Sequence, residues 1–281
     1  MRPPTVSLTV SQVEQFQTEG YLALPVLTDQ DDIARLRDSY DRIFNDQAGR
    51  DRGDQFDLAG TDEEGKRQAL PQILHPAQYA PEMNDSALLV NAAHVAKQLL
   101  GPDATCEFAH AIFKPAGYGA ETPWHQDAAY WSPELLYTSI SIWVPLQEAT
   151  PENGCMEFIP RSQNLDVLRH QSINNDPRIH GLELHAGEHR HVVNIATCPL
   201  PPGGATFHGP YMLHHTGPNR SQIPRRALIL NSGLPPHKRA SALRFPWQEV
   251  WQTARDARAT AAAARGIDVG PAPTGELRAG S

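Results

Sequence analysis

The stretch Thr122-Pro123-Trp124-His125-Gln126-Asp127 places an imidazole and a carboxylate two residues apart. In an extended backbone, successive side chains point to opposite faces, so His125 and Asp127 share a face and Gln126 points away. A neutral nitrogen and a hard oxygen that converge from one strand suit a first-row divalent metal. A second histidine from a distant segment would complete a three-ligand face that leaves the other coordination positions open. Taken alone the spacing is a weak signal, and a solvent-exposed strand end is the simpler interpretation.

Length and composition describe an ordinary globular chain. It has 281 residues, 40% of them hydrophobic and 20% charged, which is enough for a full core. The net charge of −8 disfavours nucleic acid or an anionic membrane surface as the main partner. No stretch reaches the length of a membrane span, and no apolar signal core follows the first residues. Three cysteines without a C-x-x-C pair fit a reducing compartment, so a cytoplasmic protein is expected, and its oligomeric state stays open.

The first hundred residues show helical patterns. Thr9 or Ser11 can cap a short helix that Gly20 stops, and Thr28 or Asp29 can cap a second one. The second helix is expected because apolar residues recur at helical spacing, at Ile33, Leu36, Tyr40 and Ile43. The ranges expected here are a helix over 9–19, a strand over 21–27, a helix from residue 29, a loop over 46–66 and a helix over 84–100.

Beyond residue 105 the pattern changes to that of short strands. Residues 139–146 alternate polar and apolar side chains, as expected of a half-buried strand. Residues 163–190 are polar and are expected to be an insertion. The histidines in and beside it match no zinc spacing and are expected in a solvated loop: His180, His185, His189 and His191. Further strands are expected at 108–114, 155–159, 192–195, 205–207, 212–214 and 226–230.

Helices first and short strands afterwards indicate a mainly β fold with flanking helices, a cupin-like double-stranded β-helix or jelly roll. We expect a single domain over residues 1–265. Its helices fall in 9–100, the jelly-roll core in 105–235 and a C-terminal helix in 240–265. Residues 266–281 are rich in Gly, Pro and Ala and are expected to be disordered.

Five motifs in a fixed order carry a family resemblance. They are Lys114-Pro115, Pro123-Trp124-His125-Gln126-Asp127, Asn153-Gly154-Cys155, His214-His215-Thr216-Gly217-Pro218-Asn219-Arg220-Ser221, and Arg225. Each motif is weak alone, but together the chain resembles the phytanoyl-CoA dioxygenase-like (PhyH) branch of the Fe(II)/2-oxoglutarate oxygenases, from about Phe113 to Leu230. The sequence departs from the family at Ile159-Pro160-Arg161-Ser162-Gln163, where Pro-Gly-Ser-His is usual, which concerns only the loop that follows.

The resemblance implies that His125, Asp127 and His214 bind Fe(II). It also implies that Arg225 pairs with the distal carboxylate of the cosubstrate 2-oxoglutarate, with Thr216 beside it. The residue types suit these roles, because a planar guanidinium pairs with a carboxylate through two hydrogen bonds and a hydroxyl can satisfy a remaining lone pair.

Other residues allow two interpretations. Lys114 is a candidate for the cosubstrate, although a surface lysine at a strand end fits equally well. Trp143, Tyr130 and Trp131 are candidates for the substrate pocket, but aromatics at such spacings usually belong to a core. His215 alternates to the opposite face from its neighbour and is expected to have a structural role.

The implied activity is a dioxygenase that uses Fe(II), 2-oxoglutarate and O2 to hydroxylate an unactivated carbon of a small organic molecule, with release of succinate and CO2. Because Asp127 is present, the resemblance implies hydroxylation rather than halogenation, which goes with Gly or Ala at that position. Two alternatives stay open. A cupin-like metal enzyme without 2-oxoglutarate, such as an isomerase or a simple dioxygenase, would not need Arg225. A non-catalytic jelly-roll module would keep the fold without turnover.

Overall fold

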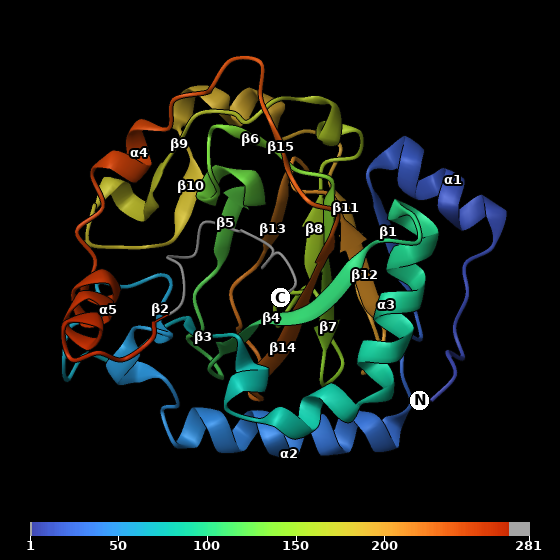
Figure 1. Ribbon diagram of the computed structural model, residues 1–281, viewed down its shortest axis with the longest axis horizontal. Helices are drawn as coiled ribbons and strands as arrows, with labels where there is room; N and C mark the ends of the chain where they lie inside the picture. Colours follow the sequence, from blue (N-terminus) through green and yellow to red (C-terminus); the bar gives the residue numbers. More distant parts are fainter. Residues whose placement is uncertain (1, 270–281) are drawn as a thin grey trace.

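The computed structural model describes residues 2–269, which form two main antiparallel sheets flanked by helices (Figure 1). The larger sheet has the strand order β1-β12-β7-β14-β4-β3-β2, and the smaller one β11-β8-β13-β5. The strands of the larger sheet are β1 (Tyr21–Leu24), β12 (Ala205–His208), β7 (Ser139–Pro145), β14 (Arg225–Gly233), β4 (Thr105–Lys114), β3 (Pro71–Leu74) and β2 (Gln55–Asp57). Those of the smaller sheet are β11 (Ala196–Cys198), β8 (Met156–Phe158), β13 (His214–Thr216) and β5 (Thr122–His125). Neighbours in space are seldom neighbours in sequence, and the expected jelly-roll class is confirmed.

Helices α1 (Val10–Glu19), α2 (Gln30–Asn45) and α3 (Ala87–Leu100) lie outside the larger sheet (Figure 1). The side chains of Thr9 and Asp29 accept backbone N–H groups at the starts of α1 and α2, as expected of capping residues. The apolar side chains at helical spacing in α2 are all buried in the main core: Ile33, Leu36, Tyr40 and Ile43. The three helices expected from the sequence are therefore confirmed.

Strand β7 differs from the expectation in its burial. All its residues are buried, so the prediction of a half-buried strand was wrong. Ile140, Ile142 and Val144 belong to the core that includes the helices, whereas Ser141 and Trp143 line the inside of the jelly roll. Alternation along β7 therefore separates a helix-covered face from a cavity face, because both faces of the strand are covered.

The range 46–66 is not a plain loop, as the sequence had suggested. It contains β2, which pairs with β3, a strand that the sequence analysis did not identify. The polar residues of β2 are buried because their hydrogen bonds are made internally. The carboxylate of Asp57, for example, accepts the backbone N–H groups of Ala69 and Leu70, each at 2.9 Å.

Two of the shorter strands begin later than expected. The segment predicted as a strand over 192–195 leads out of the 3-10 turn η7 (Ala186–His191), and the strand is β11, at Ala196–Cys198. The strand predicted at 212–214 is β13, at His214–Thr216. Both pair with β8, so the positions are set by the neighbouring strand and not by local hydrophobicity.

The insertion 163–190 contains a hairpin of strands β9 (His170–Ser172) and β10 (Leu182–Leu184). His180, just before β10, is 7% exposed, and its ring stacks on Trp251 with centroids 4.8 Å apart. The expectation of a solvated loop was therefore wrong for His180. The aromatic partner comes from a part of the chain seventy residues away, which the local polarity of the insertion does not reveal.

The C-terminal segment runs over the hairpin and the turn that follows β5. It contains α4 (Pro246–Glu249) and α5 (Ala254–Ala264) and begins after β15 (His237–Lys238), which pairs with β6 (Leu135–Leu136). The indole N–H of Trp247 donates to the carbonyl of Ala129 at 2.9 Å. Of the tail expected to be disordered, residues 270–281 lie outside the described residues. No described helix is long and apolar enough to cross a bilayer.

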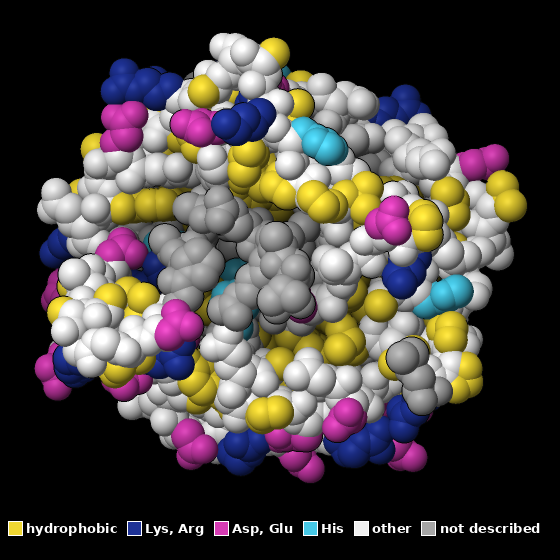
Figure 2. Space-filling model, in the orientation of Figure 1, with side chains coloured by type: hydrophobic (Ala, Val, Ile, Leu, Met, Phe, Trp, Pro, Cys, Tyr) yellow, Lys and Arg dark blue, Asp and Glu magenta, His cyan; other side chains and the backbone are white. Residues whose placement is uncertain are grey.

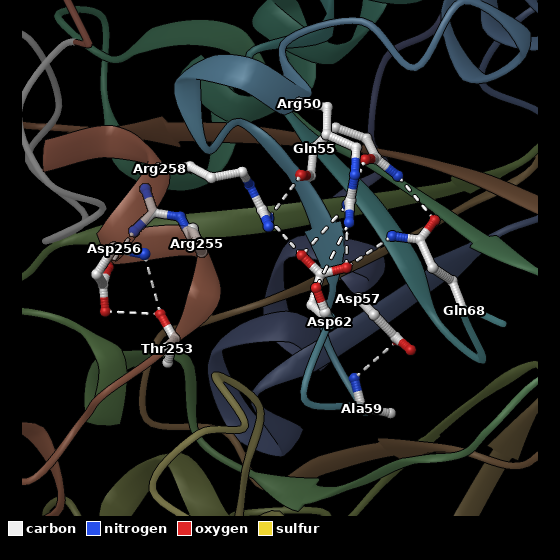
Figure 3. A network of polar contacts seen from close by, with 10 residues as sticks. All are labelled: Arg50, Gln55, Asp57, Ala59, Asp62, Gln68, Thr253, Arg255, Asp256 and Arg258. Atoms are coloured by element: carbon white, nitrogen blue, oxygen red, sulfur yellow. Dashed lines mark hydrogen bonds and ion pairs between the residues drawn. The ribbon is translucent and has the colours of Figure 1, made fainter. Parts of the chain in front are cut away.

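Figure 3 shows the hydrogen bonds and ion pairs that join α5 to the segment around β2. The buried carboxylate of Asp62 accepts hydrogen bonds from Arg50, from Gln68 and from Arg258 of α5. A buried carboxylate is stable only when its oxygens are paired in this way. The network therefore fixes the C-terminal segment, and with it Trp251, over the cavity described below.

Candidate active site

The three expected metal ligands converge inside the jelly roll. His125 ends β5 and His214 begins β13, and the two residues are direct partners across the paired strands. Asp127 opens the 3-10 turn η4 (Asp127–Tyr130) after one extended residue, so its side chain lies on the same side as that of His125. One ligand atom from each residue lies within 4.8 Å of the others. His214 Nε2 is 3.4 Å and His125 Nε2 3.8 Å from Asp127 Oδ1.

Both imidazoles are oriented by the backbone. His125 Nδ1 donates to the carbonyl of Pro123 at 2.7 Å, and His214 Nδ1 donates to the carbonyl of Met212 at 2.9 Å. Each ring therefore turns its Nε2 toward the carboxylate of Asp127, and each Nε2 is left without a proton. Such hydrogen bonds select the tautomer that binds a metal.

Two residues that the sequence analysis missed lie against the other oxygen of the Asp127 carboxylate. Ser141 of β7 donates its hydroxyl proton to Oδ2 at 2.5 Å, and His208 Nε2 of β12 lies 3.4 Å from the same oxygen. Ser141 and His208 are register partners, which brings both under Asp127. The expected strand over 205–207 stopped one residue short of His208, and the alternation in 139–146 was the available signal for Ser141.

The charges of the cluster suit a cation. Burial alone would raise the pKa of Asp127, but the facing imidazoles of His214 and His208 hold that pKa well below its usual value. Burial, followed by the proximity of His214, lowers the pKa of His125 well below its usual value. The site therefore presents an ionised carboxylate at Asp127 and an uncharged imidazole at His125, the protonation states that a divalent metal requires.

Arg225 lies at the deep end of the same cavity and is 1% exposed. Burial lowers the pKa of its guanidinium to about 10, so it is still charged at neutral pH. Its Nε has no hydrogen-bond partner, its Nη1 makes only a 3.5 Å contact to the Ile112 carbonyl, and among the described residues no carboxylate pairs with it. A buried cation without a partner is costly, so an anionic ligand at this end would stabilise the site.

Lys114 is not the surface lysine that the sequence allowed, because it is 0% exposed. Its Nζ donates to Thr216 Oγ1 at 2.8 Å, to the Thr216 carbonyl at 3.0 Å and to the Gly217 carbonyl at 2.5 Å. All three contacts are made within the protein, and burial, followed by the charge of Arg225, lowers the pKa of Lys114 well below its usual value. Since Thr216 Oγ1 accepts from Lys114, its own proton is available to donate to a ligand.

The aromatic candidates all line the cavity. The ring of Trp143 lies 5.5 Å from the guanidinium carbon of Arg225. Tyr130 stands edge-on to His125 with centroids 6.0 Å apart, and Trp131 lies on the same wall. Figure 2 shows hydrophobic and histidine side chains in the hollow at the centre of the visible face. These residues enclose the three-ligand cluster in a partly apolar surrounding.

The remaining histidines near the motifs do not join the cluster. His215 Nδ1 donates to Glu157 at 2.8 Å, and its ring stacks on Trp124, as expected of a structural residue. Arg226 pairs with Asp41 of α2, on the opposite face of β14 from Arg225. Among the described residues, the group of His125, Asp127 and His214 is the one suited to a metal ion.

The residues present fit iron and 2-oxoglutarate. Two nitrogens and one carboxylate oxygen match the donor set of non-heme Fe(II) sites, which leaves positions for other ligands. An unpaired buried arginine and a hydroxyl proton lie at the far end of the cavity, where they match a dicarboxylate. Fold and site together therefore define a non-heme iron oxygenase of the jelly-roll type.

Comparison with known proteins agrees with this class. Residues 16–227 match the family described as phytanoyl-CoA dioxygenase (PhyH). The structure resembles that of EvdO2 from Micromonospora carbonacea var. aurantiaca complexed with 2-oxoglutarate, with 33% identity, a TM-score of 0.73, and coverage of 88% of this chain and 99% of that one. The chain is 27% identical over 197 residues to the zebrafish (Danio rerio) phytanoyl-CoA dioxygenase domain-containing protein 1, covering 58% of this chain and 68% of that protein. It is 25% identical to L-proline trans-4-hydroxylase of Streptomyces griseoviridis, covering 77% and 82% of the two chains.

The chain belongs to the phytanoyl-CoA dioxygenase (PhyH) family. It is accordingly an Fe(II)- and 2-oxoglutarate-dependent dioxygenase, and the resemblance stated from the sequence is confirmed.

Proposed function

We propose that the enzyme hydroxylates an unactivated carbon of a small organic molecule, with His125, Asp127 and His214 as the Fe(II) ligands. The observation that carries this assignment is the convergence of their three ligand atoms beside a buried arginine that lacks a partner. When bound there, iron would supply, with 2-oxoglutarate and O2, the oxidising power to break the C–H bond, and 2-oxoglutarate would be converted to succinate and CO2.

Arg225 and Thr216 would bind the distal carboxylate of 2-oxoglutarate. The guanidinium supplies charge-assisted hydrogen bonds and the hydroxyl supplies one more donor. Lys114 would act through Thr216, because its Nζ is already hydrogen-bonded to Thr216 and Gly217. This differs from a direct contact with the cosubstrate and makes Lys114 a positioning residue.

Tyr130, Trp131 and Trp143 would form apolar walls around the reacting carbon, and Ser141 and His208 would hold Asp127 by the oxygen that faces away from the metal. In this arrangement one carboxylate oxygen is kept for the metal and the other is occupied. The reaction needs no general base from the protein.

The decisive measurement is succinate release from 2-oxoglutarate under air, with and without added Fe(II). We expect iron-dependent release in wild type that Arg225→Ala weakens at limiting 2-oxoglutarate. Exposed Glu148→Gln serves as the control. Absence of iron-dependent succinate in folded wild-type protein would contradict the assignment.

We further propose that residues 1–265 act as one domain in the cytoplasm, on a small molecule rather than on nucleic acid. The three cysteines are all unpaired, which suits a reducing compartment. The net charge of −8 opposes binding to a polyanion.

A further inference from the structure

Four polar side chains form a row across the larger sheet at the level of Asp127. The row runs from β4 to β14, β7 and β12, because Asn231 is the register partner of both Glu107 and Ser141, and Ser141 is the partner of His208. All four residues line the cavity. Two residues of the row face Asp127: Ser141 donates a hydrogen bond to its carboxylate, and His208 Nε2 lies 3.4 Å from the same oxygen.

The other two residues of the row, Asn231 and Glu107, are not engaged in this way. The amide oxygen of Asn231 is buried and has no hydrogen-bond partner within residues 2–269. Glu107 is exposed at the mouth of the cavity, and no ion pair involving it occurs within residues 2–269. A buried amide oxygen without a partner costs free energy, so the position is explained if a ligand donates a proton to it.

The charges around the cavity limit what that ligand can be. Among the described side chains that line it, Arg225 is the sole lysine or arginine, and the proposed function assigns it to 2-oxoglutarate. Burial lowers the pKa of His110 to about 4 and that of His180 to about 3, so these two imidazoles are uncharged at neutral pH. An anionic substrate would lose its hydration and find no free cation in these walls.

We propose that Asn231 and Glu107 bind hydroxyl groups of an uncharged, hydroxyl-bearing organic substrate. This inference rests on the proposed function, because it takes Arg225 as occupied by 2-oxoglutarate. The carbonyl oxygen of Asn231 and the carboxylate of Glu107 are both acceptors, which suits donors on the ligand. The aromatic walls of Tyr130 and Trp131 take the apolar part of the same molecule.

Binding is tested without turnover, by the unfolding temperature of the Mn(II)-loaded protein at saturating 2-oxoglutarate. Two matched pairs serve as probes: cyclohexylmethanol with cyclohexanecarboxylate, and methyl quinate with quinate. We expect the uncharged member of each pair to raise the unfolding temperature and the carboxylate to leave it unchanged. Stabilisation by the carboxylates, or by neither class, overturns the assignment.

Three variants locate the binding. Asn231→Leu should weaken the affinity for the uncharged probe roughly tenfold, because the ligand hydroxyl then faces no acceptor. Asn231→Asp keeps the acceptor and the size and should retain binding. This variant provides the test if Asn231→Leu fails to fold. Glu107→Gln also keeps an acceptor and should retain the hydroxyl probe, whereas exposed Glu148→Gln is the matched control. Unchanged affinity in Asn231→Leu overturns the role of Asn231.

The first step of the same titration separates this inference from the proposed function. Stabilisation by 2-oxoglutarate alone, dependent on Mn(II), is expected if the metal and cosubstrate sites are as assigned. If that step fails, the proposed function fails with it. If it succeeds and the probes fail, the substrate class alone is wrong.

Discussion

The two ends of the cavity differ in how completely their polar groups are paired. At the deep end, Lys114 is hydrogen-bonded to Thr216 and Gly217, and the guanidinium Nε of Arg225 has no hydrogen-bond partner among the described residues. At the mouth, the oxygens of Asn231 and Glu107 are acceptors that no donor within residues 2–269 contacts. The insertion contributes the imidazole of His180 to the cavity wall. The deep end is thus built for one charged ligand, and the mouth for hydrogen bonds to an uncharged one.

The difference teaches where specificity resides. Lys114 and Arg225 are register partners on adjacent central strands, so neither can move without disturbing the sheet. His180 and Trp251 belong to the insertion and the C-terminal segment. These segments are joined to the rest of the fold by isolated contacts, such as the hydrogen bond from the Gly181 N–H to the Leu58 carbonyl and the Asp62 network. We therefore expect the cosubstrate 2-oxoglutarate to bind at the end formed by the central strands. We expect the substrate to bind at the end to which the insertion and the C-terminal segment contribute.

The largest effect is expected from removing the metal ligands that separate the two ends. His125→Ala, Asp127→Ala and His214→Ala should each reduce iron-dependent succinate release more than about 100-fold, beyond the 10–100-fold typical of outer partners. His215→Ala is the matched control, since its side chain bonds Glu157 instead. Near-normal turnover in any of the three variants, with unchanged iron content, would remove that residue from the metal site.

The next largest effect should distinguish two adjacent arginines. Arg225→Ala should raise the concentration of 2-oxoglutarate needed for half-maximal turnover by roughly tenfold to hundredfold, since a charge-assisted hydrogen bond contributes about 1.5–3 kcal/mol. Arg226→Ala should change it far less, because that side chain pairs with Asp41 outside the cavity. A larger effect from Arg226 would contradict the assigned deep end.

A smaller effect is expected from substitution of Ser141 on β7, with Ser139 on the same strand as the control. Ser141→Ala removes the hydroxyl that holds Asp127 and should weaken Fe(II) or Mn(II) binding roughly tenfold. Ser139→Ala, two residues earlier on the same strand, removes a hydroxyl without a partner and should leave metal affinity near that of wild type. The measurement is a metal titration monitored by calorimetry in the absence of substrate. Equal effects of the two substitutions would mean that Asp127 is positioned without Ser141.

At the mouth, His180 should affect coupling more than cosubstrate use. His180→Ala is expected to lower the ratio of hydroxylated product to succinate by a factor of roughly three to ten, because the substrate loses one wall. The exposed His189 lies on the same insertion and provides the control as His189→Ala. An unchanged ratio in His180→Ala would leave the insertion with a supporting role only. Deletion of the whole insertion is a poorer test, since His170 Nε2 accepts the backbone N–H of Gln126, beside the ligands.

The last prediction concerns acid stability. Burial lowers the pKa of His110 to about 4 and that of His180 to about 3, from an unfolded value near 6.5. Below pH ~6.5 the unfolded chain gains these protons first, so each group lowers stability by about 1.4 kcal/mol per pH unit until the folded pKa is reached. Urea unfolding of the metal-free protein at pH 7, 6 and 5 should show this fall, less steep in His180→Gln. An equal slope in both proteins would mean that His180 is accessible to protons in the folded state.

The sequence by itself predicted the candidate metal ligands and determined the class of fold. His125 and Asp127 are two residues apart with an extended residue between them, so local backbone geometry alone places them on one side. The helices of residues 9–100 followed from capping residues and apolar spacing, which are also local. The order of motifs identified the family and, through it, the cofactors.

Only the tertiary structure decided what surrounds those ligands. His214 reaches His125 because β13 pairs with β5 across 89 residues of sequence, and His208 and Ser141 meet under Asp127 through the pairing of β12 with β7. The burial of Lys114 and His180 likewise depends on partners from distant segments. Strand pairing is fixed by packing over the whole fold, so a polar residue whose partner lies far along the chain looks exposed in the sequence and is buried in the molecule.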